Sequence, residues 1–424
     1  MLTKIFLERN FIKSMQNSSF TNRVSSITEI YLKGNNMEEI EDNSFVSVPY
    51  LNYLGLKENS LKNLRNNTFN GFPLLTELDC RYNHISSVEL HSFKSLTNLH
   101  SLDISNNRIE VIDFYIPNKI LNLYINDNFI SSLSPACFAD LTIMTSFRLT
   151  NNRIKILHDY VFFNLRSLGS IILANNSILE IGYKSLPITF TNLNSINLKY
   201  NSIKILKSYS FVDVSSDSID LSDNHIEIIN TNAFNGIYIV SNIWLRNNRI
   251  HTIYPGIFNN ITFIESIDLT LNKIKYLESF QFNQNDTKIL QITFLILQAN
   301  DIESINNDAF SGLNIQKLLL NNNPIKSINP AMTNDLSLLS TIQISKSTLF
   351  EIGVTQLSRA LKPTKIIKKN VFNFYKVIFL LVEDENLNSK EFCKITLELI
   401  KNNIILNLKN IDDINEFLTA CIKI

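Results

Sequence analysis

The sequence predicts an α/β solenoid in which short strands from successive repeats stack into a parallel sheet. One pattern of apolar residues recurs at a fixed period along most of the chain, and an asparagine stands at the same place in nearly every copy. In addition, 45% of the 424 residues are hydrophobic, so a continuous core can form. A period of about 20 to 50 residues is typical of repeat proteins, in which each repeat packs on its neighbours. The period therefore predicts the architecture of the repeated region.

The repeat is clearest over residues 99–109, which read L-x-x-L-x-L-x-x-N-x-L. The asparagine returns about every 24 residues, at Asn10, Asn35, Asn59, Asn83, Asn107, Asn128, Asn152, Asn176, Asn201, Asn224, Asn248, Asn272, Asn300 and Asn323. A fifteenth copy near Leu339 has Ser347 in the asparagine position. We therefore expect about 15 repeats.

Each position of the repeat has a physical role. The apolar residues alternate as a strand with one buried face requires, and the second half of the repeat provides the crossover that parallel strands need. A second apolar anchor recurs in this half, at Phe45, Phe69, Phe93, Phe138, Phe211, Phe234, Phe258 and Phe310. The asparagine amide has donors and an acceptor for turn groups that no strand reaches, so Asn35 through Asn323 are predicted to form a structural ladder. Asn247, outside that position, is expected to tolerate alanine.

The outer segments at residues 233–237 and 309–313 read A-F-N-G-I and A-F-S-G-L. With the strand pattern, they resemble the typical 24-residue class of leucine-rich repeat found in Toll-like receptor ectodomains and other animal extracellular proteins. The resemblance covers residues 2 to about 350. It implies a horseshoe with the parallel sheet on its concave face and a macromolecule bound there or on an edge. That family usually carries cysteine-rich caps and a signal peptide, which the sequence does not show.

The pattern divides the chain into a solenoid at 1–350 and a C-terminal region at 351–424. In the second part, an apolar run at 377–382 predicts a short strand, a capping signal predicts a helix over about 389–400, and apolar residues at helical spacing over 411–421 predict another helix. Because a terminal repeat needs its core covered, we expect this region to be a small α-rich cap rather than a separate functional domain.

At the other end, the chain opens inside a repeat at Leu2. A first strand with nothing stacked before it offers a bare edge, so self-association through residues 1–30 is expected. The first ten residues carry charge and lack the apolar core of a signal peptide. The family resemblance implies an extracellular or cell-surface location, and the missing leader favours a cytoplasmic alternative.

Several function classes are disfavoured by composition. The 39 Lys and Arg balance the 39 Asp and Glu, so no global field favours nucleic acid. No apolar run approaches the roughly 20 residues of a membrane span. Nine glycines form no phosphate-binding loop, the six histidines form no metal motif, and the four cysteines have no metal-like spacing. The sequence therefore predicts no enzyme, no cofactor and no metal site. Cys80 occupies an inward position and is expected to be a small core residue.

The outward strand positions are free to carry specificity, because the fold does not need their side chains. A central column is predicted to contain Phe6, Tyr31, Gly55, Asp79, Asp103, Tyr124, Arg148, Ile172, Asn197, Asp220, Trp244, Asp268, Ile296, Leu319 and Gln343. Exposed aromatic and arginine side chains are enriched at binding hot spots. We therefore expect ligand binding at Trp244, Arg246, Asn242, Asp220, Asp268, Tyr124 and Arg148, against the alternative that isolated surface aromatics are common.

Two functions follow from these features. The first is a non-catalytic scaffold that binds a protein or glycan partner on the concave surface, of extracellular receptor-like or matrix type. The alternative is an intracellular leucine-rich-repeat interaction scaffold, which the few cysteines favour.

Overall fold

The computed structural model describes residues 2–344, except residues 18, 21–25, 188–192, 238, 259, 280–281, 283–288, 328–331 and 333–335. Ser347 and the predicted cap at 351–424 lie outside these residues. The chain falls into two compact units. The first runs to Asn224 and includes Gly236–Ile239, and the second comprises His225–Asn235 and the chain from Val240 onward.

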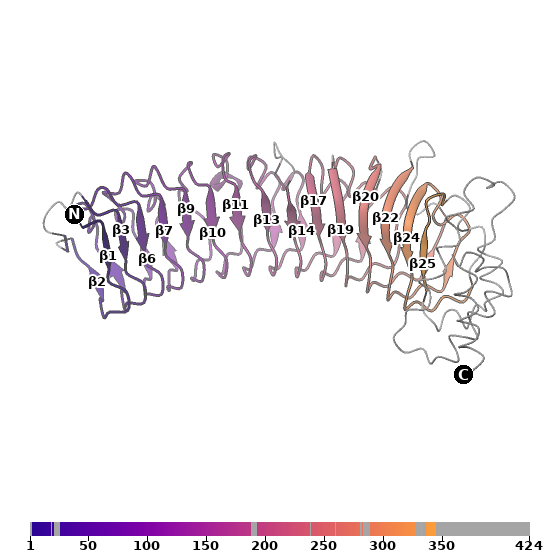
Figure 1. Cartoon of the computed structure of the whole chain (residues 1–424), viewed down its shortest axis with the longest axis horizontal. Helices are drawn as coiled ribbons and strands as arrows, with labels where there is room; N and C mark the ends of the chain where they lie inside the picture. The colour runs from indigo at the N-terminus through magenta and orange to yellow at the C-terminus, as the bar shows by residue number, and fades with distance from the viewer. Residues whose placement is uncertain are drawn as a thin grey trace, which may run out of the picture. The chain divides into compact units, whose positions relative to one another are not determined.

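The first unit contains ten strands of a parallel sheet, which Figure 1 shows side by side. They are β1 (Lys4–Phe6), β3 (Glu29–Tyr31), β5 (Tyr53–Gly55), β7 (Glu77–Asp79), β9 (Ser101–Asp103), β10 (Asn122–Tyr124), β11 (Ser146–Arg148), β13 (Ser170–Ile172), β15 (Ser195–Asn197) and β17 (Ser215–Asp220). Equivalent residues of successive repeats are paired, as in Leu54 with Leu78. The sequence period therefore sets the register.

The second unit contains five strands of the same kind (Figure 1). They are β19 (Ile239–Trp244), β20 (Phe263–Asp268), β22 (Leu290–Ile296), β24 (Leu313–Leu319) and β25 (Thr341–Gln343). Several of these strands are longer than the three residues usual in the first unit. Ile267 pairs with Leu295, and Leu295 with Leu318, so the inward column continues through this unit.

The return halves of the repeats consist of turns and, in ten of those described, a two-residue strand. These strands are β2 (Ser14–Met15), β4 (Glu39–Ile40), β6 (Asn63–Leu64), β8 (Ser87–Val88), β12 (Ile156–Leu157), β14 (Glu180–Ile181), β16 (Ile205–Leu206), β18 (Ile228–Ile229), β21 (Tyr276–Leu277) and β23 (Ser304–Ile305). Among the elements bounded in the described part of the chain, the helical one is a 3-10 turn, η1 (Pro135–Cys137). The fold is thus a parallel β-solenoid with almost no helix, which corrects the α/β class. Extended chain covers about 3.3 Å per residue against 1.5 Å in a helix, so a short return segment crosses the core without one.

The core contains the residues that the repeat pattern places inside. Except in β1, where Ile5 is half-buried, the middle residue of each three-residue strand is a buried apolar side chain. The eight predicted phenylalanine anchors are also all buried, which confirms that part of the prediction. Neighbouring anchors stack, with ring centroids 5.9 Å apart for Phe69 and Phe93 and 5.5 Å apart for Phe234 and Phe258. Cys80 is fully buried with a free thiol, as expected of a core residue.

The asparagines of the repeat join one turn of the solenoid to the next. The Nδ2 of Asn107 donates to the carbonyls of Ile104 and Cys80, both at 3.0 Å, and its Oδ1 accepts from the N–H of Ile85 at 2.9 Å. Thirteen such asparagines are buried, at positions 35, 59, 83, 107, 128, 152, 176, 201, 224, 248, 272, 300 and 323. Because these backbone groups have no sheet partner, the amide satisfies what would otherwise be unpaired in the core.

The residue before each ladder asparagine has a left-handed backbone, which the sequence analysis missed. These residues are Arg9, Gly34, Glu58, Tyr82, Asn106, Asp127, Asn151, Asn175, Tyr200, Asp223, Asn247, Leu271, Ala299 and Asn322, with φ between 50° and 70°. Left-handed backbone is unfavourable for residues other than glycine, asparagine and aspartate. Asn247 has φ 53°, a region that alanine disfavours although Ala299 adopts it, so Asn247→Ala is expected to lower stability for a backbone reason.

Candidate functional site

The candidate binding surface is the side of each parallel sheet that faces away from the core, here called the strand face. It consists of the first and last residues of the three-residue strands, whose middle residue points inward, and of the equivalent residues in the longer strands. The alternation of strand side chains places these residues outside, where folding does not restrict their identity. The side-chain chemistry of this face changes from strand to strand along the chain.

At β1, β3 and β5 the strand face of the first unit is aromatic. The rings of Phe6 and Tyr31 stack with centroids 4.8 Å apart, and Tyr31 and Tyr53 follow at 4.9 Å. The hydroxyl of Tyr31 donates to Glu29 at 2.6 Å, and this hydrogen bond raises the pKa of Tyr31 to about 12. A Cβ added at Gly55 would lie 2.9 Å from the Tyr53 hydroxyl, so the glycine makes room for that ring.

At β7 and β9 the face is charged and internally paired. Arg81 donates to both carboxylate oxygens of Asp79, at 2.9 and 2.8 Å, and lies 3.3 Å from a carboxylate oxygen of Asp103. The hydrogen bonds with Asp79 raise the pKa of Arg81, and burial raises the pKa of Asp103. Because these charges satisfy one another, this network is less available to a ligand.

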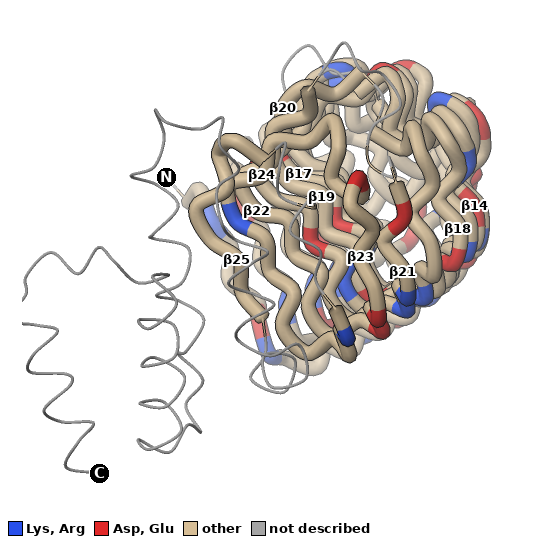
Figure 2. The backbone as a smooth tube through the Cα atoms, turned by 90° about the vertical axis from the view of Figure 1, so that its right-hand side faces the viewer, with Lys and Arg blue, Asp and Glu red and all other residues tan. Residues whose placement is uncertain are grey.

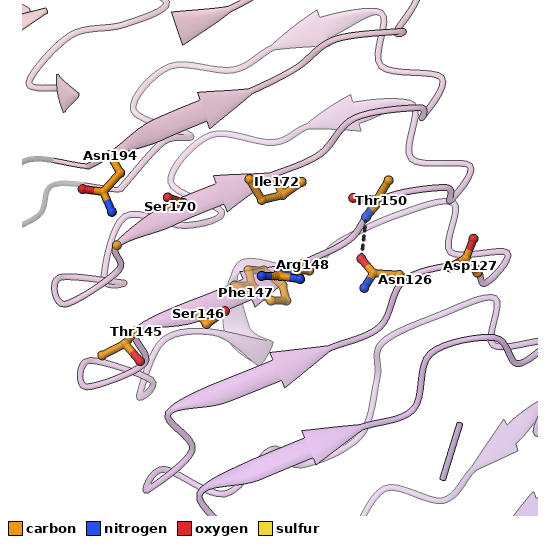
Figure 3. Close-up of a pocket in the computed structure, with 11 residues that line it drawn as sticks. Asn126, Asp127, Thr145, Ser146, Phe147, Arg148, Thr150, Ser170, Ile172 and Asn194 are labelled. Carbon is orange, nitrogen blue, oxygen red and sulfur yellow. Dashed lines mark hydrogen bonds between the residues drawn. The ribbon is translucent and has the colours of Figure 1, made fainter. Parts of the chain in front are cut away.

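A hollow of about 590 Å³ opens on the strand face at β11 and β13 (Figure 3). It is lined by Asn126, Asp127, Thr145, Ser146, Phe147, Arg148, Thr150, Gly169, Ser170, Ile172 and Asn194. Of the predicted site residues, Arg148 lines the hollow, and Tyr124 is its register neighbour on β10 outside the lining. The guanidinium carbon lies 5.3 Å from the Tyr124 ring centroid. This distance is that of a cation–π contact. The sequence predicted both residues on the outward face but did not indicate the hollow between the small side chains.

In the second unit, Trp244 lies on the strand face at the end of β19 and is 36% exposed. It pairs with Asp268 of β20, whose carboxylate accepts from the N–H of Thr270 at 2.8 Å. Arg246 is exposed two residues after Trp244, and Asn242 is half-buried two residues before it. The structure thus brings together four of the predicted residues on two neighbouring strands.

Asp220 belongs to the first unit, at the end of β17, where its carboxylate accepts from the N–H of Ser222 at 2.9 Å. It pairs with Asn197 of β15. Among the described residues, no cluster of histidine, cysteine or acidic side chains could hold a metal ion. In that same part of the chain, no helix combines the length and apolarity required to cross a bilayer.

Comparison with known families agrees with this geometry. A leucine rich repeat model matches residues 1–61, 25–85, 49–109 and 119–178, and the model of a BspA type leucine rich repeat region matches residues 189–297. Together the matches take in well over half of the chain. The chain is a leucine-rich-repeat protein. No curated protein matches it in sequence.

Solved leucine-rich-repeat structures resemble this leucine-rich-repeat chain at low sequence identity. A chain of the LRIM1/APL1C complex is 16% identical with a TM-score of 0.51, and the match covers 75% of this chain and 57% of that one. The leucine-rich repeat domain of APL1B is 17% identical (TM-score 0.49), covering 80% and 82%. TLR13, solved with ssRNA13, is 20% identical (TM-score 0.41), covering 82% and 62%. The chain thus spans less than two thirds of the LRIM1/APL1C and TLR13 chains, and the likeness to the former supports the fold.

Proposed function

We propose that this leucine-rich-repeat protein is a non-catalytic scaffold that binds a partner protein on its strand face. The observation that carries the proposal is the exposed Trp244, which pairs with Asp268 and is followed two residues later by the exposed Arg246, although the core does not require an indole there. Tryptophan and arginine are enriched among residues that dominate binding energy. The indole of Trp244, the guanidinium of Arg246 and the carboxylate of Asp268 form a surface of mixed chemistry that suits a protein.

The charge distribution supports a protein over a nucleic acid. Figure 2 shows acidic and basic residues interspersed near β21 and β23 of the second unit rather than gathered into a basic face. One example is Glu303, which lies 3.1 Å from Lys275 and 2.7 Å from Lys326. Nucleic-acid binding depends on several unpaired cations along the phosphate backbone. Paired charges of this kind on the return side do not supply them, and on the strand face Asp268 beside Trp244 would repel phosphate.

The finer features of the proposal follow from the sequence pattern and the family resemblance. We infer about fifteen repeats in a horseshoe with the strand face on its concave side, and a role for residues 351–424 in covering the end of the core. We also infer an extracellular or cell-surface location of receptor-like or matrix type. An intracellular scaffold is the second candidate, favoured by the few cysteines, of which Cys80 is buried with a free thiol.

The test is substitution of Trp244. A partner captured by unbiased pull-down with the full chain should bind Trp244→Ala at least about 30-fold more weakly, because a hot-spot truncation costs about 2 kcal/mol or more. The melting temperature should be nearly unchanged, since the indole is outside the core. Tyr254, which is 45% exposed and off the strand face, provides the matched control. If Trp244→Ala binds as the parent does and Tyr254→Ala does not, the strand-face proposal is wrong.

A further inference from the structure

The hollow at β11 and β13 contains one cation with no charged partner in the described part of the chain. Arg148 is exposed and forms no ion pair there, and its register neighbours are Tyr124 on one side and Ile172 on the other. The nearby acids are already engaged. Asp103 lies 3.3 Å from Arg81, and Asp127 accepts a hydrogen bond from Asn151 at 2.6 Å. The guanidinium of Arg148 is therefore available to an external anion.

The rest of the hollow is neutral and polar. The side chains of Ser146, Ser170 and Asn194 line it, and within the described ranges none of the three forms a side-chain hydrogen bond. Figure 3 shows Thr145 and Asn194 at one end of the hollow and Asp127 at the other, with Arg148 between them. A ligand that places its anionic group on Arg148 can thus extend over hydroxyl and amide groups while avoiding the aspartate.

We propose that this hollow binds the carboxylated terminal sugar of an acidic glycan. A guanidinium binds a carboxylate through two parallel hydrogen bonds, and serine, threonine and asparagine side chains both donate to and accept from sugar hydroxyls. A volume of about 590 Å³ is in the range of small-ligand sites. This site is separate from the Trp244 surface, so it stands or falls independently of the proposed protein partner.

Two other ligand classes, a phosphate group and an extended peptide, fit this hollow less well. A phosphate group carries close to two negative charges at neutral pH, whereas the hollow offers one cation and includes Asp127. An extended peptide is usually bound along a sheet edge or a long groove. The lining here comes from β11, β13 and the adjoining loops, and the strand face presents side chains rather than a free edge.

The test compares methyl β-D-glucuronide with methyl β-D-glucoside, which share the sugar ring but differ in whether a carboxylate is present. Calorimetry or ligand-observed NMR with the full chain should show millimolar or tighter binding of the glucuronide and at least about tenfold weaker binding of the glucoside, as loss of a charged hydrogen-bond pair implies. Arg148→Gln should weaken glucuronide binding by about the same factor. Arg148→Lys should lose less affinity for the glucuronide, since lysine keeps the positive charge but lacks the two parallel N–H donors of the guanidinium.

Two further variants keep the result interpretable. Ser170→Tyr fills the hollow while retaining Arg148, and it should abolish glucuronide binding without lowering the melting temperature, because Ser170 is on the strand face. Arg108→Gln removes an exposed arginine outside the hollow and should bind as the parent does. The proposal is overturned if the parent shows no glucuronide binding at tens of millimolar, if both sugars bind equally, or if Arg148→Gln binds normally. It is also overturned if an N-acetylated, amidated Gly-Glu-Gly peptide binds as tightly as the glucuronide.

Discussion

An asparagine amide carries two donors and an acceptor, and the ladder positions use both kinds. In Asn248, the Nδ2 donates to the carbonyls of Leu245 and Arg246 at 3.0 and 3.3 Å, and the Oδ1 accepts from the N–H of Ile226 at 2.9 Å. A serine or aspartate at this position could not supply the same set of donors and acceptor. At the residue scale, the repeat therefore depends on a single side chain that replaces missing backbone partners.

We predict that Asn248→Ala lowers the free energy of unfolding by about 1 to 3 kcal/mol, because it leaves buried backbone groups unsatisfied. A denaturant titration measures this loss. Asn242→Ala is the matched control, since this residue is half-buried on the strand face and its side chain has no hydrogen bond in the described part of the chain. An equal loss in both variants would mean that the ladder bonds contribute nothing specific. Asn247 is unsuitable as a control because its left-handed backbone disfavours alanine.

At the scale of an element, the exit from each strand is a left-handed turn that leads into the ladder asparagine. Asn106, Asn151 and Asn175 suit this conformation, whereas Leu271 and Ala299 adopt it at φ 58° and 50°. Left-handed backbone costs an ordinary residue roughly 1 to 2 kcal/mol. The repeat keeps the turn geometry even where the residue disfavours it, because the flanking strand and ladder bonds determine the backbone path.

Leu271→Asn is therefore expected to raise the free energy of unfolding by about 0.5 to 1 kcal/mol, since asparagine is more tolerant of the left-handed region. Thermal or denaturant unfolding can detect this gain. Leu271 is 42% exposed, so little packing is lost. Leu74→Asn is the control, because Leu74 is 44% exposed and is not left-handed. If the two variants shift stability alike, backbone strain at Leu271 is not the cause.

On the scale of the whole molecule, contacts are local in sequence although the chain is long. Each strand pairs with strands from adjacent repeats, as in β5 with β7 and β7 with β9. The free energy of unfolding of such a chain is close to the sum of the intrinsic stabilities of its repeats and of the interface energies between neighbouring repeats. Damage to the core should therefore remain near the site of the change.

Phe69→Ala tests this locality. The side chain is fully buried and stacks on Phe93, so its truncation should cost about 3 to 5 kcal/mol locally. Hydrogen exchange followed by mass spectrometry should show faster exchange in β5, β7 and β9 and unchanged protection in β15. Tyr50→Ala, a truncation of a 46% exposed ring in the same region, should leave exchange unchanged throughout. A uniform loss of protection in Phe69→Ala would indicate a globally cooperative fold instead.

The sequence by itself determined the repeat, the inward and outward sides of each strand, and the phenylalanine anchors. These features could be predicted because burial imposes a strict period on the apolar residues, and that period can be read from a single sequence. The asparagine positions followed from the same spacing, as Asn107 illustrates. The α/β class predicted for the solenoid was wrong because the apolar pattern of the return segments does not distinguish a helix from turns and two-residue strands. The two helices predicted over about 389–400 and 411–421 lie outside the described residues.

Only the tertiary structure decided how the outward residues interact. Arg81 is neutralised by Asp79 and Asp103, whereas Arg148 is left beside Tyr124 over a hollow between small side chains, although both arginines occupy outward positions of similar repeats. The room for Tyr53 over Gly55 and the left-handed backbone of Leu271 are likewise invisible in the sequence. The physical reason is that contacts between outward side chains depend on which residues of neighbouring repeats the register brings together, and these residues differ from repeat to repeat. The left-handed turn recurs with the period, but the identity of a residue such as Leu271 does not reveal it.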